Sequence, residues 1–373
     1  MSYTNGLDDP SAYFQTALYT GAGSTVVTVT NDGNSDLQPD FLWFKRRDSA
    51  GGHALLDTSR GANVTSGFGP TGYSFVLNSN STASEVADST GVMTITSDGF
   101  TVKELTYAGG NTNTGSMVAW QWHCNGGTNS SNTDGSITST VQANQDAGFS
   151  IGTFTGTGLA ATIGHGLGVK PDMLILKSRN NPSGAAMYWM VAHVGLDGMA
   201  GTKNLFMNET WAADTSSAVW GNVAPTSSVF TVSTNAAVNY SGNNMLFYAF
   251  ANKQGYSKFG SYVGNGNPNG PFIYTGFKPA FVLIKNVDAT QVWIMYDGAR
   301  KPFNRDDNVA SIYASETNAE YTGASYHNLD ILSNGFKIRL TDASQNGNGN
   351  KHIYMAFAEN PFVTSTGIPT TAR

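Results

Sequence analysis

The chain contains almost no cysteine and few charged residues. Cys124 is the single cysteine among 373 residues, so the sequence excludes an internal disulfide and a thiolate metal cage. We expect Cys124 to be a small filler residue at the end of a strand rather than a reactive thiol. Charged residues make up 12% of the chain, the formal net charge is −6, and no basic run exceeds Lys45, Arg46 and Arg47. Without a basic stripe to follow a phosphate backbone, nucleic acid is not an expected partner.

Long hydrophobic runs and coiled-coil repeats are also missing. No apolar stretch approaches the about 20 residues that cross a membrane as a helix, so membrane insertion is not expected. The first residues, MSYTNG, have neither the charged nor the apolar region of a signal peptide. We therefore expect a protein made in a cytoplasm and not exported by a cleaved signal. The absence of long heptads and of Gly-x-Gly-x-x-Gly between a strand and a helix excludes a coiled-coil shaft and a dinucleotide fold.

Turn-forming residues are abundant instead. The chain has 43 glycines, together with many serines, threonines and asparagines, and 12% of its residues are aromatic. This composition is poor in helix formers and rich in turn formers, which predicts an all-β chain of short strands. The aromatic content argues against disorder, because such a chain can bury enough apolar surface to offset its loss of conformational entropy.

One stretch occurs three times, at residues 37–48, 169–180 and 277–288. In each copy a proline, Pro39, Pro171 or Pro279, is followed by a run of apolar residues and then by a basic residue. The apolar run predicts a strand buried on both faces, which we call the marker strand. Proline fits the first strand position, where its missing N–H costs no hydrogen bond. The basic residue is expected where the strand leaves the core.

Other landmarks keep the same order and nearly the same spacing around the marker strand. A glycine-containing turn precedes it, starting at Tyr19, Phe154 and Tyr262. A later strand carries Phe100, Phe230 or Phe336, and each copy closes on an apolar run that we align at Ala119, Ala249 and Ala356. Landmarks in one order at matched spacing predict one folding unit used three times.

The landmarks divide the chain into three repeats joined by short segments. In each repeat, short candidate strands separated by Asn-Gly, Asp-Gly and Gly-Asn turns predict a β-sandwich of jelly-roll or immunoglobulin-like type. Residues 137–141 alternate apolar with hydroxyl side chains and are suited to adding a strand to a neighbouring sheet. The predicted order is an N-terminal docking arm (1–11), repeat 1 (12–124), a linker (125–147), repeat 2 (148–253), repeat 3 (254–362) and an extended C-terminal docking arm (363–373).

Repeats 1 and 3 share an aspartate and an arginine at matched positions after the marker proline. They are Asp57 and Arg60 in repeat 1, and Asp297 and Arg300 in repeat 3. As a functional site, such a pair beside a tryptophan would bind a sugar or a carboxylate. As a structural element, it is a salt bridge or turn cap that recurs because the fold recurs. We favour the structural interpretation, because repeat 2 has His193 in place of the aspartate and has lost the pair.

Residues for catalysis or metal binding do not form recognisable patterns. The six histidines lack the spacing of a zinc site, and neither a Gly-x-Ser-x-Gly elbow nor an EF-hand loop occurs. Glycoside hydrolysis would need two carboxylates facing each other across a cleft. The candidate acids lie in polar loop segments and are expected to be solvated: Glu85 with Asp88, Glu209 with Asp214, and Glu316 with Glu320. We predict a non-enzyme without catalytic residues, cofactor or metal.

The same polar segments differ between repeats in length and content, and they contain aromatic residues near turns. Loops on a fixed scaffold usually carry binding, so we take these segments as the candidate contact surface for a host glycan or protein. For any single ring, filling of the core is the alternative. The candidates are Trp211 and Trp220 in repeat 2, and Tyr313, Tyr321 and Tyr326 in repeat 3.

Several of these stretches resemble a repeat found in virion proteins of tailed phages, notably phages of marine bacteria. The resemblance is strongest in repeat 1, clear in repeat 3 and weaker in repeat 2. The closing stretch, residues 367–373, is also similar to the tails of such proteins. The stretches of repeat 1 that carry the resemblance are residues 19–23, 37–48, 57–61, 97–102 and 118–122.

The resemblance implies a structural protein of a virion, tail-fibre-like or otherwise undefined, and supplies no catalytic residues. We expect terminal arms that dock on other virion proteins and loops that adhere to the host surface. A tail-fibre or tail-tip component is the leading role, and a head-bound knob or capsid decoration protein is the alternative. A second alternative is a polysaccharide depolymerase, which needs two carboxylates converging on one groove. A homo-oligomer around a symmetry axis is a further expectation.

Overall fold

The computed structural model describes residues 6–60, 74–88, 93–103, 113–181, 184–304, 310–323 and 328–369. In these residues strands predominate and pair antiparallel. The described α-helices have one turn each: α1 (Val194–Asp197), α2 (Ser217–Trp220), α3 (Ala236–Asn239) and α4 (Ala343–Asn346). The all-β prediction is therefore confirmed. None of the described helices has the length and apolar character needed to cross a membrane.

Repeat 1 begins with a 3-10 turn, η1 (Pro10–Ala12), and contributes a larger and a smaller sheet. A second 3-10 turn, η2 (Thr58–Arg60), follows the larger sheet's last strand, and β5 (Ser74–Val76) pairs with β6 (Val86–Asp88). The larger sheet has the order β1 (Phe14–Thr20), β9 (Ser116–Trp122), β3 (Phe41–Arg46), β4 (His53–Asp57). The smaller has the order β2 (Val27–Val29), β8 (Gly99–Val102), β7 (Met93–Thr96).

Repeat 2 has a similar central order with additional strands at both edges. Its larger sheet has the order β10 (Ser130–Asn132), β11 (Ser139–Asn144), β12 (Phe149–Thr155), β19 (Asn244–Phe250), β14 (Met173–Ser178), β15 (Met190–His193), β16 (Lys203–Phe206), β17 (Asp214–Thr215). Its smaller sheet pairs β13 (Ala161–Gly164) with β18 (Val229–Val232). Strands β10 and β11 come from the stretch expected as a linker. The alternating residues in that stretch lead into β11, which adds to the sheet beside β12.

Repeat 3 shows the same two-sheet arrangement. Its larger sheet has the order β20 (Ser257–Val263), β27 (Lys351–Pro361), β22 (Phe277–Asn286), β23 (Trp293–Asp297), β24 (Ile312–Tyr313). Its smaller sheet has the order β21 (Phe272–Tyr274), β26 (Gly335–Ile338), β25 (Leu329–Leu332). The three repeats therefore use equivalent strands in the same order around the marker strand.

The marker strand is β3, β14 or β22, and it lies between the last strand of its repeat and its hairpin partner. All of β14 is buried, as is β3 up to Lys45, so the prediction of burial on both faces is confirmed. Pro39 and Pro171 precede their strands by two residues. Pro279 lies inside β22, where the register with β27 shifts, which is the kind of irregularity that tolerates a missing N–H.

The strand register corrects our alignment of the closing strands. Phe41, Met173 and Phe281 are each two residues after the marker proline, and they pair with Trp122, Phe250 and Phe357. Counting back along each strand makes Trp120, Tyr248 and Met355 equivalent. The alignment of Ala119 with Ala249 and Ala356 was wrong by two residues. Alanine marked different positions because a small residue is accommodated at more than one place in these strands.

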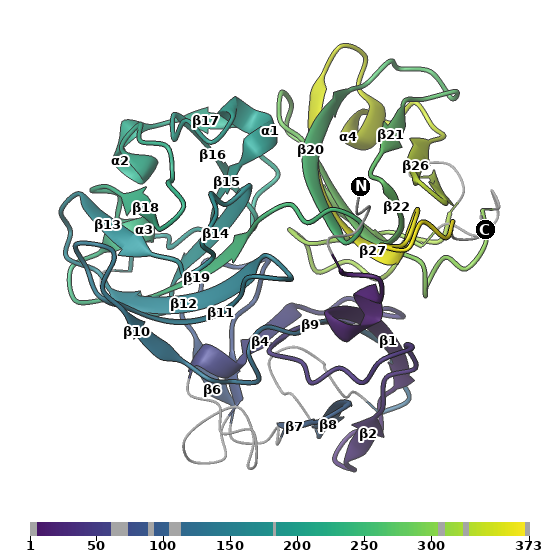
Figure 1. Cartoon of the computed structure of the whole chain (residues 1–373), viewed down its shortest axis with the longest axis horizontal. Coiled ribbons are helices and arrows are strands. Elements are labelled where there is room, and N and C mark those ends of the chain that lie inside the picture. Colours follow the sequence, from purple (N-terminus) through teal and green to yellow (C-terminus); the bar gives the residue numbers. More distant parts are fainter. Residues whose placement is uncertain are drawn as a thin grey trace.

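The two faces of each larger sheet have different neighbours. One face packs against the smaller sheet of the same repeat. The other face is turned toward the centre of the molecule, where all three larger sheets share one hydrophobic core (Figure 1). Phe41 of β3 packs on Tyr248 of β19 with ring centroids 4.3 Å apart, and Phe357 of β27 contacts Trp122 and Phe250 at 5.6 and 6.0 Å.

The described parts of both terminal segments fold against this chain. Leu7 is 6% exposed and belongs to the central core. After β27 the chain turns back, with a bridge between Val363 and Pro369, instead of continuing as an extended arm. Ser365 donates from its backbone N–H to Asp8 at 2.7 Å, so the two segments also contact each other.

Because each repeat has one face of its larger sheet in the common core, we expect the repeats to unfold together. A fragment of residues 12–124 alone would expose Phe41, Trp120 and Trp122 to water. We predict that this fragment shows no cooperative thermal transition in circular dichroism and binds the hydrophobic dye ANS. The full chain should show one transition. A fragment that melts cooperatively at the temperature of the full chain would contradict the shared core.

Candidate functional site

Asp57 and Arg60 form a buried ion pair that joins repeat 1 to repeat 2. Arg60 Nε donates to Asp57 Oδ2 at 2.6 Å, and the same oxygen accepts from the hydroxyl of Tyr248 in repeat 2 at 2.8 Å. Arg60 also donates to Glu85 at 2.9 Å, and Arg179 of repeat 2 donates to Glu85 at 2.6 Å. The four charged groups form a neutral network, which we call a seam quartet, with Tyr248 donating to it.

A second seam quartet joins repeat 3 to repeat 1 in the same way. Arg300 Nε donates to Asp297 at 2.5 Å, and Trp120 Nε1 of repeat 1 donates to the same carboxylate at 2.9 Å. Arg300 donates to Glu320 at 3.0 Å, and Arg47 of repeat 1 donates to Glu320 at 2.9 Å. Trp120 occupies the position of Tyr248, so the two seams match residue by residue.

The third seam, between repeats 2 and 3, has the same backbone geometry without the charges. Ala213 N donates to Val287 O at 2.8 Å, as Glu85 donates to Arg179 and Glu320 to Arg47 at the other seams. The four quartet positions are occupied here by His193, Leu196, Ala213 and Val287. The network is therefore kept or lost as a set, as expected if its members act together.

His193 occupies the position of the aspartate and makes the hydrogen bond across this seam. Its Nδ1 accepts from Gly195 N at 2.9 Å, which leaves Nε2 to donate to Tyr354 O of repeat 3 at 3.0 Å. Burial lowers the pKa of His193 to about 4, so the ring stays neutral at pH 7. A neutral histidine can bridge this seam without a charged partner.

Glu85 and Glu320 were expected to be solvated loop acids, and that expectation was wrong. Their side chains are 9% and 7% exposed, because each is enclosed by one arginine of its own repeat and one arginine of the adjoining repeat. Burial opposes ionisation of Glu320, but hydrogen bonds and charges from Arg47 and Arg300 lower its pKa. Both glutamates are structural components of the seams.

Three further hydrogen bonds join the repeats in a circle at the lysine end of the marker strands, opposite the end with the seam quartets. A ring N–H opposite the marker lysine donates in each case to a backbone carbonyl of the adjoining repeat at 2.9 Å. The three pairs occupy equivalent positions in the strand register: His53 to Tyr313, Trp189 to Asn78, and Trp293 to Phe206. The repeats are thus related by an approximate threefold rotation about the common core.

The marker lysines Lys45, Lys177 and Lys285 are fully buried, although we expected the basic residue where the strand leaves the core. Lys177 Nζ donates to Thr82 O of repeat 1 at 3.1 Å, and Lys285 Nζ donates to Thr210 O of repeat 2 at 2.8 Å. Burial lowers the pKa of Lys45 to about 8 and the pKa of Lys177 and Lys285 to about 7. Backbone carbonyls accept from all three ammonium groups inside the molecule, and Lys45 Nζ donates to Arg46 O of its own repeat at 2.7 Å.

The predicted contact aromatics have different environments. Trp211 is 43% exposed and packs against Tyr188 and Phe206, so it offers a ring at the surface. Trp220 is 2% exposed and fills the core of repeat 2. Tyr313 and Tyr321 are half-buried. Tyr326 lies outside the described residues.

Cys124 is buried at the end of β9, in the place expected for a small filler. Its thiol lies 3.3 Å from Gln142 O and 3.4 Å from Phe149 O. Burial raises the pKa of this thiol well above its ordinary value, which disfavours the reactive thiolate.

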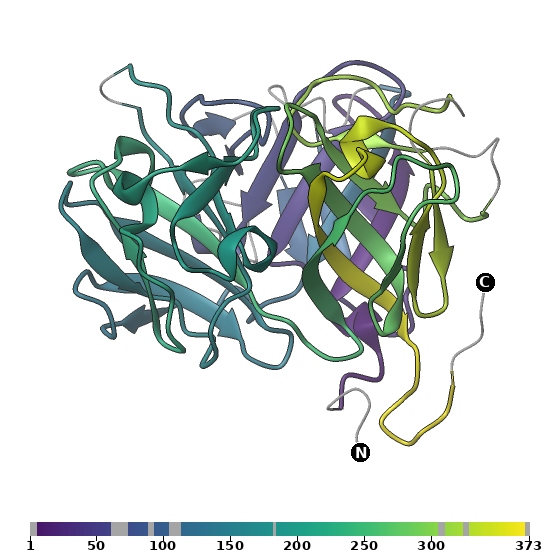
Figure 2. The same ribbon diagram turned by 90° about the horizontal axis from the view of Figure 1, so that it is seen from above.

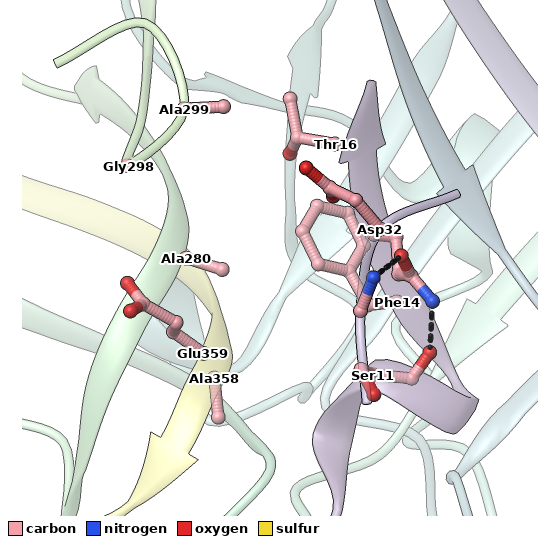
Figure 3. Close-up of a pocket in the computed structure, with 11 residues that line it drawn as sticks. Ser11, Phe14, Thr16, Asp32, Ala280, Gly298, Ala299, Ala358 and Glu359 are labelled. Carbon is pink, nitrogen blue, oxygen red and sulfur yellow. Dashed lines mark hydrogen bonds between the residues drawn. The ribbon is translucent and has the colours of Figure 1, made fainter. Parts of the chain in front are cut away.

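A cavity of about 270 Å³ opens where repeat 3 meets repeat 1 (Figure 3). Figure 3 shows Asp32 and Thr16 of β1 on the repeat 1 wall and Glu359 on the repeat 3 wall. The Glu359 carboxylate is ion-paired with Lys278. Sequence reasoning missed these residues, because nothing in the local pattern places the end of β27 beside β1. Within the part of the chain that the structure describes, no cluster of side chains is suited to a metal ion.

Together, the fold and the seams define an all-β protein in which three repeats are joined around one hydrophobic core. The chain belongs to the family DUF7483, a domain of unknown function, whose model matches residues 9–361. Neither a curated protein nor a solved structure matches the chain.

The seam quartet predicts a strong coupling between its members. Arg60→Leu alone should lower the free energy of unfolding by about 3–5 kcal/mol, because it leaves Asp57 buried without a cation and Glu85 with Arg179 alone. Converting the whole set to the third-seam residues (Asp57→His, Arg60→Leu, Glu85→Ala, Arg179→Val and Tyr248→Met) should recover much of this loss.

Urea denaturation followed by tryptophan fluorescence measures both effects. The matched control is Arg339→Leu, because the ion pair of Arg339 with Asp330 leaves the arginine 41% exposed, and we expect a loss below about 1 kcal/mol. Losses that simply add across the five substitutions would show that the positions are not coupled.

The buried lysines predict an unusual dependence of stability on pH. Their pKa values are lowered in the folded state, so above pH 7 the unfolded chain binds more protons than the folded chain. Stability should therefore rise with pH from about 7 to about 10, by up to about 1.4 kcal/mol per pH unit for each lysine. Urea denaturation across this range measures the slope. Lys177→Met should reduce it, whereas Lys203→Met, on an exposed residue, should not. A flat profile in the original chain would contradict this account.

Proposed function

We propose that the chain is a non-enzymatic structural protein of a tailed-phage virion, with loops that adhere to the host surface. The leading role is a tail-fibre or tail-tip component, and a head-bound knob or capsid decoration protein is the alternative. One observation carries the proposal: the ionisable residues shared by the repeats are used to join the repeats to one another. Such use suits a rigid body whose task is to be attached and to make contact.

We also propose that each repeat is a β-sandwich. In repeat 1, Phe44 of the larger sheet shares a core with Val29 and Phe100 of the smaller sheet. In repeat 3, Ile284 and Phe336 share a core in the same way. Two antiparallel sheets with a common core are the basis of sandwich architecture, which supports this assignment.

The arrangement of the ends supports attachment at one side and contact at the other. Residues 6–12 and 363–369 lie together beside the proline ends of the marker strands, and Figure 2 shows the purple start and yellow end of the chain leaving on the same side. The exposed ring of Trp211 lies beyond the opposite, lysine end, next to Thr210. Terminal segments bound to other virion proteins would therefore leave this loop facing outward.

One feature favours the polysaccharide depolymerase as a second candidate. Asp32 and Glu359 line one cavity from opposite walls, and a pair of carboxylates is what glycoside hydrolysis requires. Glu359 is ion-paired with Lys278. The pair comes from different repeats, so hydrolysis would depend on the assembled molecule.

Gold-labelled antibodies against this chain should bind phage particles at the tail, and images of labelled particles would show the position directly. Labelling at the head would replace the tail role with the decoration role. Particles that contain none of this chain by mass spectrometry would contradict a virion protein of either kind.

Incubation of the purified chain with host surface glycans separates adhesion from hydrolysis. We expect saturable binding that Trp211→Ala weakens, with no release of oligosaccharides measured by mass spectrometry. Release that is abolished by Asp32→Asn and by Glu359→Gln would show a depolymerase and overturn the non-enzymatic assignment.

A further inference from the structure

Among the described strands β1 lies at the edge of its sheet, with backbone groups directed away from its paired neighbour β9. Tyr13 O accepts from His123 N at 3.0 Å, which fixes the alternation of hydrogen bonds between β1 and β9. In this register the N–H and C=O groups of Thr16 and Leu18 point away from β9. Leu18 is also 41% exposed. An exposed sheet edge of this kind is a template for a further strand.

The equivalent edge in repeat 2 is occupied by this chain itself. Strand β12 corresponds to β1, since Phe149 pairs with Phe250 as Phe14 pairs with Trp122. Strand β11 lies along β12, with Gln142 opposite Ile151.

Gln142 of β11 also reaches across the seam to repeat 1. Its side-chain amide donates to Thr58 Oγ1 at 2.6 Å and to Ser59 Oγ at 2.7 Å. An extended segment therefore both extends the sheet and fills the seam between repeats 1 and 2.

At the seam between repeats 3 and 1, the same place contains the cavity of Figure 3. Thr16 stands where repeat 2 has Ile151 and repeat 3 has Phe259. Gly298 and Ala299 stand where repeat 1 has Thr58 and Ser59. Both sides of this seam therefore have smaller side chains than the equivalent positions of the seam between repeats 1 and 2. A strand equivalent to β11 is not among the described strands beside β1.

The cavity presents a buried hydroxyl without a described partner and two carboxylates, of which that of Glu359 is also ion-paired with Lys278. Thr16 Oγ1 is buried, and no described atom makes a hydrogen bond with it. The residues that line the cavity include Asp32 and Glu359 and no basic residue. A basic side chain entering between the two carboxylates would be favoured electrostatically and would also be within reach of the threonine hydroxyl.

We propose that the edge of β1 and the adjoining cavity bind an extended segment of another protein, which pairs antiparallel with β1 and places a lysine opposite Thr16. The segment repeats the geometry of β11 on β12, with lysine in the place of Gln142 because the cavity is acidic. Backbone hydrogen bonds supply affinity and the lysine supplies specificity. The inference follows from the three seams alone and does not depend on a virion role.

The probe is a fluorescein-labelled peptide of residues 137–145 carrying Gln142→Lys, titrated with the full chain by fluorescence anisotropy. We expect saturable binding with a Kd below about 1 mM. A matched peptide carrying Gln142→Glu should bind roughly tenfold or more weakly, because its carboxylate meets Asp32 and Glu359. A third peptide carrying both Gln142→Lys and Thr140→Pro should lose binding, because proline removes the backbone donor opposite Leu18.

Variants of the chain assign the binding to this edge. Thr16→Ile places the residue of the equivalent position in repeat 2 into the cavity and should prevent binding of the lysine peptide, with folding checked by a thermal melt. Asp32→Asn, at an exposed position, should weaken the lysine peptide and strengthen the glutamate peptide. Absence of saturable binding, equal binding of the three peptides, or binding unchanged by Asp32→Asn and by folded Thr16→Ile would overturn the proposal.

Discussion

The shared central core is the constraint on which the rest of the structure depends. An isolated antiparallel sheet commonly buries one face and exposes the other, but the larger sheets here bury both. The second face of each is covered by the other two repeats, so residues such as Trp122, Phe250 and Phe357 are buried by partners distant in sequence. This requirement explains why the marker strands are continuous apolar runs and why their terminal lysines are enclosed. It also makes the seams part of the folding unit rather than surfaces between independent domains.

The three seams satisfy their buried polar groups in two different ways. Each seam brings together the end of one hairpin and the closing strand of the adjoining repeat, where polar backbone groups are buried. Two seams use a neutral set of four charges, and the third uses His193 with apolar neighbours. The charged set includes Asp57 and Arg60, whose desolvation is offset only while every member is present.

The repeats, the marker strand and the all-β class could be predicted from sequence because they are encoded by local order, turn residues and apolar runs. The environment of Glu85 could not, because its partner Arg179 is distant in sequence and belongs to another repeat. One signal was available: arginine occurs at position 47 and at its equivalent 179, but valine at 287. Aspartate occurs at positions 57 and 297, but histidine occurs at 193. Each aspartate is brought together with an arginine of another repeat only if the three repeats are arranged in a ring. The cavity beside Thr16 could not be predicted, since it lies between β1 and the turn after β23, where Gly298 and Ala299 are small, and only the fold brings these segments together.

Native-state hydrogen exchange tests the central claim most directly. If the core is shared, the slowest amides of β3, β14 and β22 should exchange through the same global opening and report one free energy, which falls equally in all three strands as denaturant is added. Three separate free energies, one for each repeat and with different sensitivity to denaturant, would show that the repeats fold as independent domains and would contradict this account.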